Sequence, residues 1–191
     1  VTASFAINDD YADSDQYLLL ATKNGTVKKT PISEYTNIRK SGLIAISLRD
    51  DDQLIEAKLI DKDEDIMIGT KYGMAIRFKE SDVRITGRSS YGVRGITLTG
   101  DDVVVGMQKI SQGDFVLVVS EKGMGKLTST EEFKLQRRGG KGLRCYKITE
   151  KTGNLVGFKL TDKSREIMLI TNEGVIIRMS LKDAKDIGRN T

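Results

Sequence analysis

Short apolar runs alternate along the chain with polar segments that are rich in glycine and charge. Within these runs the apolar residues either alternate with polar ones or are β-branched, as in residues 103–105 (Val-Val-Val) and 115–119 (Phe-Val-Leu-Val-Val). Both patterns are typical of β-strands, whereas helical spacing is poor throughout. The pattern predicts an all-β protein, in which residues 130–133 and 181–184 could each form a single helical turn.

The sequence also repeats itself about every fifty residues. Four segments each consist of the end of an apolar run, a hydroxyl residue, two polar residues and a glycine; they are residues 20–25, 68–73, 118–123 and 169–174. Their glycines lie 48, 50 and 51 residues apart. Glycine supplies the positive φ that a tight hairpin needs, so each segment predicts a β-hairpin.

Each repeat contains four expected strands, A to D, with the hairpin between B and C. The expected strands are 1–7, 17–22, 26–30 and 43–48 in the first repeat, 54–60, 66–70, 74–79 and 93–98 in the second, 103–110, 115–120, 124–128 and 143–148 in the third, and 155–160, 167–171 and 175–179 in the fourth, which lacks strand D. Four-stranded units at this period are typical of propeller blades. We expect one domain, 1–191, with blades at about 1–48, 53–98, 103–148 and 155–191; an irregular β-sandwich or barrel is the alternative.

Composition narrows the possible chemistry. The chain has no histidine and one cysteine, Cys145, which excludes Ser-His-Asp and Cys-His catalysis and histidine or multi-cysteine metal sites. Cys145 is expected to be a small buried strand residue, and a single cysteine fits a reducing compartment. No apolar run approaches the length of a membrane span, so no membrane partner is expected. No catalytic residues are predicted in this chain.

Charge is distributed unevenly although the net charge is only +4. The four segments between strands C and D, residues 28–42, 76–95, 126–144 and 177–191, hold 19 of the 31 basic residues and 7 of the 27 acidic ones. Equivalent loops of a blade array lie at equivalent positions, so these segments predict one basic rim that binds a polyanion. Aspartate clusters such as Asp50, Asp51 and Asp52 lack calcium-loop spacing and are expected to keep nucleic acid off the other face.

The candidate contacts with the polyanion are 17 of the 19 cations of these four segments. They are Lys28, Lys29, Arg39 and Lys40 in the first, Arg77, Lys79, Arg84, Arg88 and Arg94 in the second, Lys126, Lys134, Arg137, Arg138, Lys141 and Arg144 in the third, and Arg178 and Arg189 in the fourth.

The most concentrated segment, which we call the box loop, comprises Gln136, Arg137, Arg138, Gly139, Gly140, Lys141 and Gly142. Glycines let backbone N–H groups approach an anion, and arginine supplies forked donors suited to phosphate. The Gly-Lys-Gly of this loop is not a P-loop, because it lacks the upstream glycine and the following Ser or Thr. No nucleotide cofactor is therefore expected.

The box loop matches, over all seven residues, the GyrA box, the signature loop of the C-terminal domain of DNA gyrase A (GyrA). Residues 24–30, 77–81, 92–96 and 187–191 also resemble that family. The resemblance implies a β-pinwheel, a propeller-like disc whose neighbouring blades exchange strands, and a basic perimeter that wraps duplex DNA. The box usually lies in the first of about six blades, so its place in the third repeat suggests that the chain corresponds to the later four.

The resemblance further implies a non-catalytic module of an ATP-dependent type IIA topoisomerase, an isomerase that supports negative supercoiling in the bacterial cytoplasm. Its expected partners are duplex DNA, the remainder of GyrA and DNA gyrase B (GyrB), in an A2B2 assembly. ATP and Mg2+ would be needed by the whole enzyme, not by this chain. Two alternatives remain open: the equivalent C-terminal DNA-binding domain of topoisomerase IV, and a propeller that docks proteins through an acidic face.

Overall fold

The computed structural model describes residues 15–37 and 40–191, and the expected strand at 1–7 lies outside them. The strands are β1 (Tyr17–Thr22), β2 (Thr26–Pro31), β3 (Leu54–Ile60), β4 (Asp65–Thr70), β5 (Met74–Lys79), β6 (Val93–Arg94), β7 (Val104–Lys109), β8 (Phe115–Ser120), β9 (Gly125–Ser129), β10 (Leu143–Arg144), β11 (Leu155–Thr161), β12 (Glu166–Ile170) and β13 (Ile176–Ser180). Single 3-10 turns are η2 (Ile32–Tyr35), η3 (Glu80–Asp82), η4 (Ile110–Gln112), η5 (Thr130–Glu132) and η6 (Leu181–Asp183). The predicted all-β class is confirmed, as are the turns near 130 and 181.

The four predicted hairpins are present as β1–β2, β4–β5, β8–β9 and β12–β13. Their turn glycines all have positive φ, between 75° and 84°. The hydroxyl residue three positions before each glycine caps the turn: Thr70 Oγ1, for example, accepts from the backbone N–H of Met74 at 3.2 Å. Equivalent bonds occur in the other three hairpins. The sequence signature therefore has a local cause, a glycine for the backbone and a hydroxyl for an otherwise unpaired N–H.

Three of the four sheets are built from two consecutive repeats. Hairpin β1–β2 is flanked by β3 and β6, the first and last strands of the second repeat, in the order β3-β1-β2-β6. Hairpin β4–β5 is flanked in the same way by β7 and β10 of the third repeat, and β8–β9 receives β11 of the fourth. The repeats along the sequence are therefore not the sheets in space, and neighbouring repeats are joined by shared hydrogen bonds.

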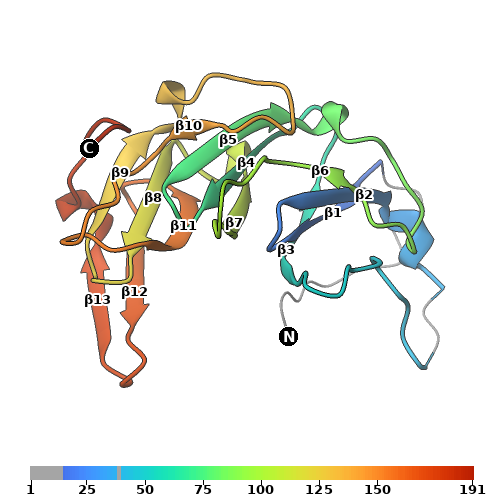
Figure 1. Ribbon diagram of the computed structural model, residues 1–191, viewed down its shortest axis with the longest axis horizontal. Coiled ribbons are helices and arrows are strands. Elements are labelled where there is room, and N and C mark those ends of the chain that lie inside the picture. The colour runs from blue at the N-terminus through green and yellow to red at the C-terminus, as the bar shows by residue number, and fades with distance from the viewer. Residues whose placement is uncertain (1–14, 38–39) are drawn as a thin grey trace.

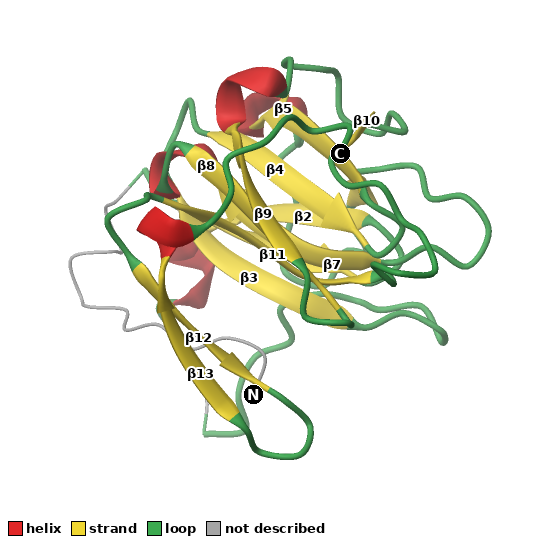
Figure 2. Ribbon diagram, turned by 90° about the vertical axis from the view of Figure 1, so that its left-hand side faces the viewer, coloured by secondary structure: helices red, strands yellow, loops and turns green. Residues whose placement is uncertain are grey.

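The sheets follow one another along an open arc, with the chain direction running from β1 to β13 (Figure 1). Hairpin β12–β13 projects from one end of this stack (Figure 2). It pairs with no third strand among the described residues, and its apolar side chains Met168, Ile170 and Ile176 are exposed. The remaining sheets bury their apolar faces against one another.

The core between the sheet of hairpin β4–β5 and the sheet of hairpin β8–β9 contains one closely packed aromatic side chain. Phe158 of β11 is 1% exposed and lies against Gly69 of β4 and Gly106 of β7. A Cβ at Gly69 would lie 2.2 Å from the Phe158 ring, so only glycine fits there. Truncating such a buried aromatic typically costs about 3–5 kcal/mol. Phe158 therefore joins three strands from three repeats.

One predicted strand is wrong. Residues 43–48 were expected as strand D of the first repeat, but they form no strand, and Ile44 is largely exposed. In the later repeats strand D pairs with the hairpin of the preceding repeat, as β6 pairs with β2 and β10 with β5. For residues 43–48 this partner would be the hairpin of a repeat before the first one, and the described residues contain no such hairpin. The segment therefore has no strand with which to pair.

Cys145 is buried, 1% exposed, as its sequence context suggested. Burial raises the pKa of its thiol to about 12, so the group stays protonated at neutral pH. In the described part of the chain no helix is long and apolar enough to cross a membrane.

Candidate nucleic-acid interface

The segments that follow strand C in the second, third and fourth repeats lie along the convex edge of the arc (Figure 1). We call them the outer loops: residues 80–92, 130–142 and 181–191. Each begins with a 3-10 turn, η3, η5 or η6, directly after strand C. Because the same local pattern recurs in each repeat, the loops occupy equivalent places on consecutive sheets.

The box loop is part of the central outer loop, and its backbone is fixed by the preceding repeat. The N–H of Gln136 donates to the carbonyl of Arg77 at 2.8 Å, and the N–H of Gly139 donates to that of Gly95 at 2.7 Å. Gly142 has φ +76°, and a Cβ on it would lie 2.4 Å from the Ala75 carbonyl oxygen. The glycines therefore allow the loop to lie against β5.

Eight of the predicted cations have exposed side chains that make no hydrogen bond or ion pair within the described residues. They are Lys40, Lys79, Arg84, Arg94, Lys134, Arg137, Lys141 and Arg144. Unpaired exposed cations keep their full charge available to an anion. Arg84 and Lys134 occupy equivalent positions, 11 residues after the hairpin glycine, and Arg94 and Arg144 occupy another pair, 21 residues after it.

Lys185 was missed by the sequence reasoning. It is exposed and lies 11 residues after Gly174, the position that Arg84 and Lys134 hold in their repeats. Aligning the repeats position by position, instead of counting charge by segment, would have identified it. Arg39 lies outside the described residues.

Two predicted contacts, Lys28 and Lys126, require correction because their side chains point inward. Lys28 is 0% exposed and donates to Thr30 Oγ1 at 2.5 Å and to the Ala45 carbonyl at 3.0 Å. Lys126 is 1% exposed and donates to the carbonyls of Gly188 and Thr191 at 2.6 and 2.9 Å. The two lysines lie at equivalent positions, three residues after a hairpin glycine, so their side chains point to the same face of their sheets, where the segments that contain Ala45 and Gly188 cover them.

The charge state of these lysines reflects their burial. Desolvation lowers the pKa of Lys28 to about 8, with smaller effects from Glu34, which raises it, and Arg88, which lowers it. Desolvation also lowers the pKa of Lys126. Neither ammonium is accessible to a phosphate, so both lysines serve contacts within the fold.

A third correction concerns Lys29, which is also buried. Its Nζ lies 2.5 Å from Glu80 Oε2 and 3.1 Å from the Glu80 carbonyl oxygen. Arg77 is half-buried and donates through Nε and Nη2 to Asp65 at 2.9 and 2.7 Å. Arg178 makes the equivalent pair with Glu166 in β12, although it is exposed. Pairing with a carboxylate reduces the net positive charge that such a side chain presents to an anionic ligand.

Three further predicted contacts, Arg88, Arg138 and Arg189, are half-buried and contact neighbouring repeats. Arg138 Nε donates to the Asp82 carbonyl at 3.0 Å, and its Nη1 donates to the Arg94 carbonyl at 2.6 Å. Its neighbour Arg137 is exposed. The two adjacent arginines of the box loop thus have different surroundings.

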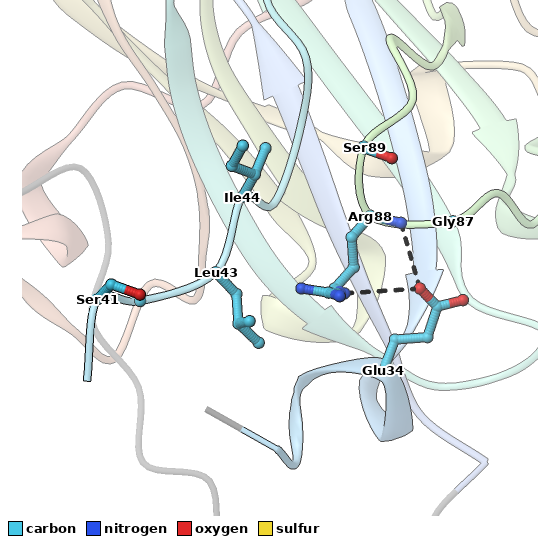
Figure 3. A pocket seen from close by; sticks show the side chains of 8 residues that line it. Glu34, Ser41, Leu43, Ile44, Gly87, Arg88 and Ser89 are labelled. Carbon is cyan, nitrogen blue, oxygen red and sulfur yellow. Dashed lines mark hydrogen bonds and ion pairs between the residues drawn. The ribbon is translucent and has the colours of Figure 1, made fainter. Parts of the chain in front are cut away.

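Two hollows adjoin these loops. The larger, about 790 Å³, is lined by Glu34, Ser41, Gly42, Leu43, Ile44, Gly87, Arg88 and Ser89 (Figure 3). Its one arginine faces Glu34, with Arg88 Nε 4.0 Å from Glu34 Oε2. The smaller, about 360 Å³, mixes Arg49 and Arg94 with Asp51 and Asp52. Neither has a nucleophile beside a base, and no cluster of metal-ligating side chains occurs among the residues described.

Comparison with known proteins places these features in a family. A family model described as DNA gyrase C-terminal domain, beta-propeller, matches residues 16–61, 64–111, 114–162 and 165–191. The GyrA protein of Staphylococcus aureus (strain MRSA252) is 43% identical over 182 residues, covering 94% of this chain and 20% of that protein. The chain thus spans about a fifth of the length of the curated relatives it matches.

Solved structures agree with the sequence comparison. The C-terminal domain of DNA topoisomerase IV superposes with a TM-score of 0.90 at 30% identity, covering 97% of this chain and 58% of that one. The DNA gyrase A C-terminal domain superposes with a TM-score of 0.83 at 30% identity, covering 92% and 59%. The E. coli ParC C-terminal domain, with a TM-score of 0.69 and 14% identity over 93% and 77%, shows the fold alone.

Proposed function

The chain belongs to the DNA gyrase C-terminal domain family, and on that premise we propose that it binds duplex DNA on its outer loops and bends it around the convex edge of the arc. One observation carries this proposal: exposed cations recur at equivalent positions of consecutive repeats, as Arg84, Lys134 and Lys185 do. Their spacing follows the spacing of the sheets, so they form a row along one basic rim.

Such a row suits a DNA backbone better than it suits base edges. Duplex DNA carries about one negative charge per 1.7 Å of its axis, so a line of cations meets phosphate at any position. Contacts with phosphate position a duplex without reading its sequence. We therefore expect binding that depends strongly on salt and weakly on sequence.

Bending the duplex requires several contacts acting together. Smooth bending of a 20–30 base-pair segment costs on the order of 1–6 kcal/mol. A single loop cannot offset that cost at physiological salt, but successive loops along a curved edge can. The convex placement of the outer loops supports wrapping rather than end binding (Figure 1).

In the longer protein, the proposed role is to support ATP-dependent negative supercoiling without catalysing a step itself. The wrapped segment would be presented to the cleavage core formed by the rest of GyrA, in an A2B2 assembly with GyrB in the bacterial cytoplasm. ATP and Mg2+ would be held by those other parts. The exposed cations of the outer loops suit this role, because they hold a duplex without altering its covalent bonds.

Salt titration of binding to a linear duplex tests the proposal. Engagement of the eight unpaired predicted cations together with Lys185 would give a slope of log K against log salt of about −8. Dyes at the two ends of the duplex would approach one another on binding if the DNA bends. A slope near zero would overturn the DNA interface and favour the alternative of a propeller that docks proteins through its acidic loops. Binding without approach of the ends would overturn wrapping.

The C-terminal domain of topoisomerase IV is a second candidate, favoured by the higher TM-score of 0.90. The complete box at 136–142 favours the gyrase type, because it matches the gyrase signature in every residue. Joining the chain to the rest of GyrA, with GyrB, DNA and ATP present, separates the two. Negative supercoiling would support gyrase, whereas relaxation alone would support topoisomerase IV.

A further inference from the structure

One arginine position recurs at three successive junctions between repeats. Arg88, Arg138 and Arg189 each lie 15 residues after a hairpin glycine, and all three are half-buried. Arg138 Nη1 donates to the carbonyl of Arg94, and Arg189 Nη1 donates to that of Arg144 at 3.4 Å. Arg94 and Arg144 are themselves equivalent, so the same contact joins two consecutive pairs of repeats.

The same arginines also contact the 3-10 turn of the preceding repeat. Its acidic residues Glu34, Asp82 and Glu132 each lie nine residues after a hairpin glycine. Glu34 Oε2 accepts from the backbone N–H of Arg88 at 3.2 Å and lies 4.0 Å from Arg88 Nε, and Glu132 Oε2 accepts from the backbone N–H of Arg189 at 2.9 Å. At the central junction the Asp82 carbonyl accepts from Arg138 Nε instead.

Backbone bonds repeat around these side chains. The N–H of Thr97 donates to Gly140 at 2.9 Å, and the equivalent N–H of Lys147 donates to Thr191 at 3.3 Å. The Thr97 hydroxyl donates to the Gly139 carbonyl at 2.7 Å. Ser47 makes both equivalent bonds, through its N–H and its hydroxyl, to the loop of the second repeat. Each outer loop is therefore held along its length by the repeat before it.

We propose that Arg88, Arg138 and Arg189 are positioning residues that latch each outer loop onto the preceding repeat and thereby set the spacing of the exposed cations along the convex edge. The part of this inference that concerns DNA rests on the function proposed above. A planar guanidinium suits the latch, because Nε and Nη1 of Arg138 reach carbonyls at Asp82 and Arg94 together, which the single nitrogen of an ammonium does less well.

Amide hydrogen exchange in the DNA-free chain tests directly whether Arg138 holds the outer loop on the preceding repeat. The reporters are the backbone N–H groups of Gly139 and Thr97, which donate to the carbonyls of Gly95 and Gly140 in the neighbouring repeat. Arg138→Lys keeps the charge but loses one arm of the fork, so both amides should exchange about tenfold faster. Arg137→Lys is the matched control and should leave them unchanged. Exchange in Arg138→Lys equal to that of the wild type would overturn the latch.

Thr97→Val provides a second variant at the same junction without altering charge. It removes the hydroxyl bond to Gly139 and should also accelerate exchange at Gly139, so the test does not depend on Arg138 variants folding. Unchanged exchange at Gly139 in Thr97→Val would contradict the proposal.

DNA binding separates positioning from phosphate contact. Arg137→Gln should reduce the magnitude of the salt slope by about 0.9, because one phosphate contact is lost. Arg138→Gln should leave the slope unchanged but reduce the approach of the duplex ends, because the cation row is misplaced. A slope reduced equally by both substitutions would overturn the assignment of Arg138. If the wild type shows no salt-dependent binding, the proposed function fails and hydrogen exchange alone decides the latch.

Discussion

Lys29 Nζ lies 2.5 Å from Glu80 Oε2, and the two side chains are only 6% and 4% exposed. Lys29 belongs to the first repeat and Glu80 to the second, so this buried pair joins two repeats that exchange strands. Removing one partner of a buried pair leaves the other charge without compensation. The pair therefore links the stability of the fold to the register between repeats.

Lys29→Met should lower the free energy of unfolding by about 3–5 kcal/mol, because Glu80 is left buried and unpaired. The double variant Lys29→Met/Glu80→Leu should recover most of that loss, since an apolar pair of similar volume needs no desolvated charge. Denaturant unfolding measures both. Equal losses in the single and double variants would show that the charges are not coupled.

Lys28 should give the stability a characteristic dependence on pH. Its pKa in the folded state is about 8, below the ordinary value of 10.5, because burial disfavours the ammonium. Between these values the unfolded chain binds more protons than the folded one, so the contribution of Lys28 to stability rises as pH increases from 8 to 10.5. Below the folded-state pKa, Lys28 is protonated in both the folded and the unfolded state. Its unfavourable contribution to the free energy of unfolding then no longer changes with pH.

Lys28→Met removes this titration while keeping the length of the side chain. The stability of the wild type relative to Lys28→Met should therefore increase as pH rises above the folded-state pKa of about 8, as measured by denaturant unfolding at each pH. Comparing the two proteins at the same pH cancels the titrations of Tyr35, whose pKa burial raises, and of Lys126, whose pKa burial lowers. A difference that stays constant up to the ordinary lysine pKa would show that Lys28 is solvated in the folded state.

The box loop should contribute to DNA binding through its exposed cations. Arg137→Gln/Lys141→Gln should reduce the magnitude of the salt slope by about 1.8, since each phosphate contact contributes about 0.9. The matched control is Lys62→Gln/Lys151→Gln, which removes the same charge from exposed positions outside the outer loops. Equal effects of the two double variants would mean that net charge, not the rim, governs binding.

Adding Arg138→Gln to the box-loop double variant should weaken wrapping further without unfolding the domain. Thermal unfolding followed by circular dichroism would check the fold, and supercoiling by the intact enzyme would check the function. Supercoiling equal to that of the wild type would show that this copy of the loop is dispensable.

Two glycines that each directly precede an expected strand D allow the cost of backbone strain to be separated from the cost of close contact. Gly142 and Gly42 have similar φ, +76° and +78°, but a Cβ would lie 2.4 Å from the Ala75 carbonyl at Gly142 and meet nothing within 4 Å at Gly42. Gly42→Ala should cost about 1–2 kcal/mol, the cost of the left-handed conformation. Gly142→Ala should cost more, because β5 must also move. Equal losses on denaturant unfolding would mean that β5 yields freely.

The local sequence was sufficient to identify the hairpins. Their signals lie within six residues: an apolar strand end, a hydroxyl that caps the turn and a glycine at positive φ, as in Thr70 and Gly73. The recurrence of that unit predicted the number of repeats, and alternation within each run predicted the strands. The family also followed from contiguous residues, because the box loop is a continuous motif.

The roles of individual cations could not be predicted in the same way. Lys28, Lys29 and Lys126 were interpreted as surface cations from the charge of their segments, yet the fold buries all three. Arg137 and Arg138 are adjacent in the sequence, but only the contact with Asp82 and Arg94 distinguishes the half-buried residue from the exposed one. Lys185 was overlooked because charge was counted by segment.

The sequence by itself therefore determined the all-β class, the hairpins, the period and the family, because these depend on residues close together in the chain. Tertiary structure alone decided which cations face solvent and which repeat each loop contacts. Strand pairing in β10 and β5 joins residues about seventy positions apart, and no local pattern encodes such a contact. Burial of a charge depends on what covers it, and for Lys29 and Lys126 the covering segment comes from the next repeat.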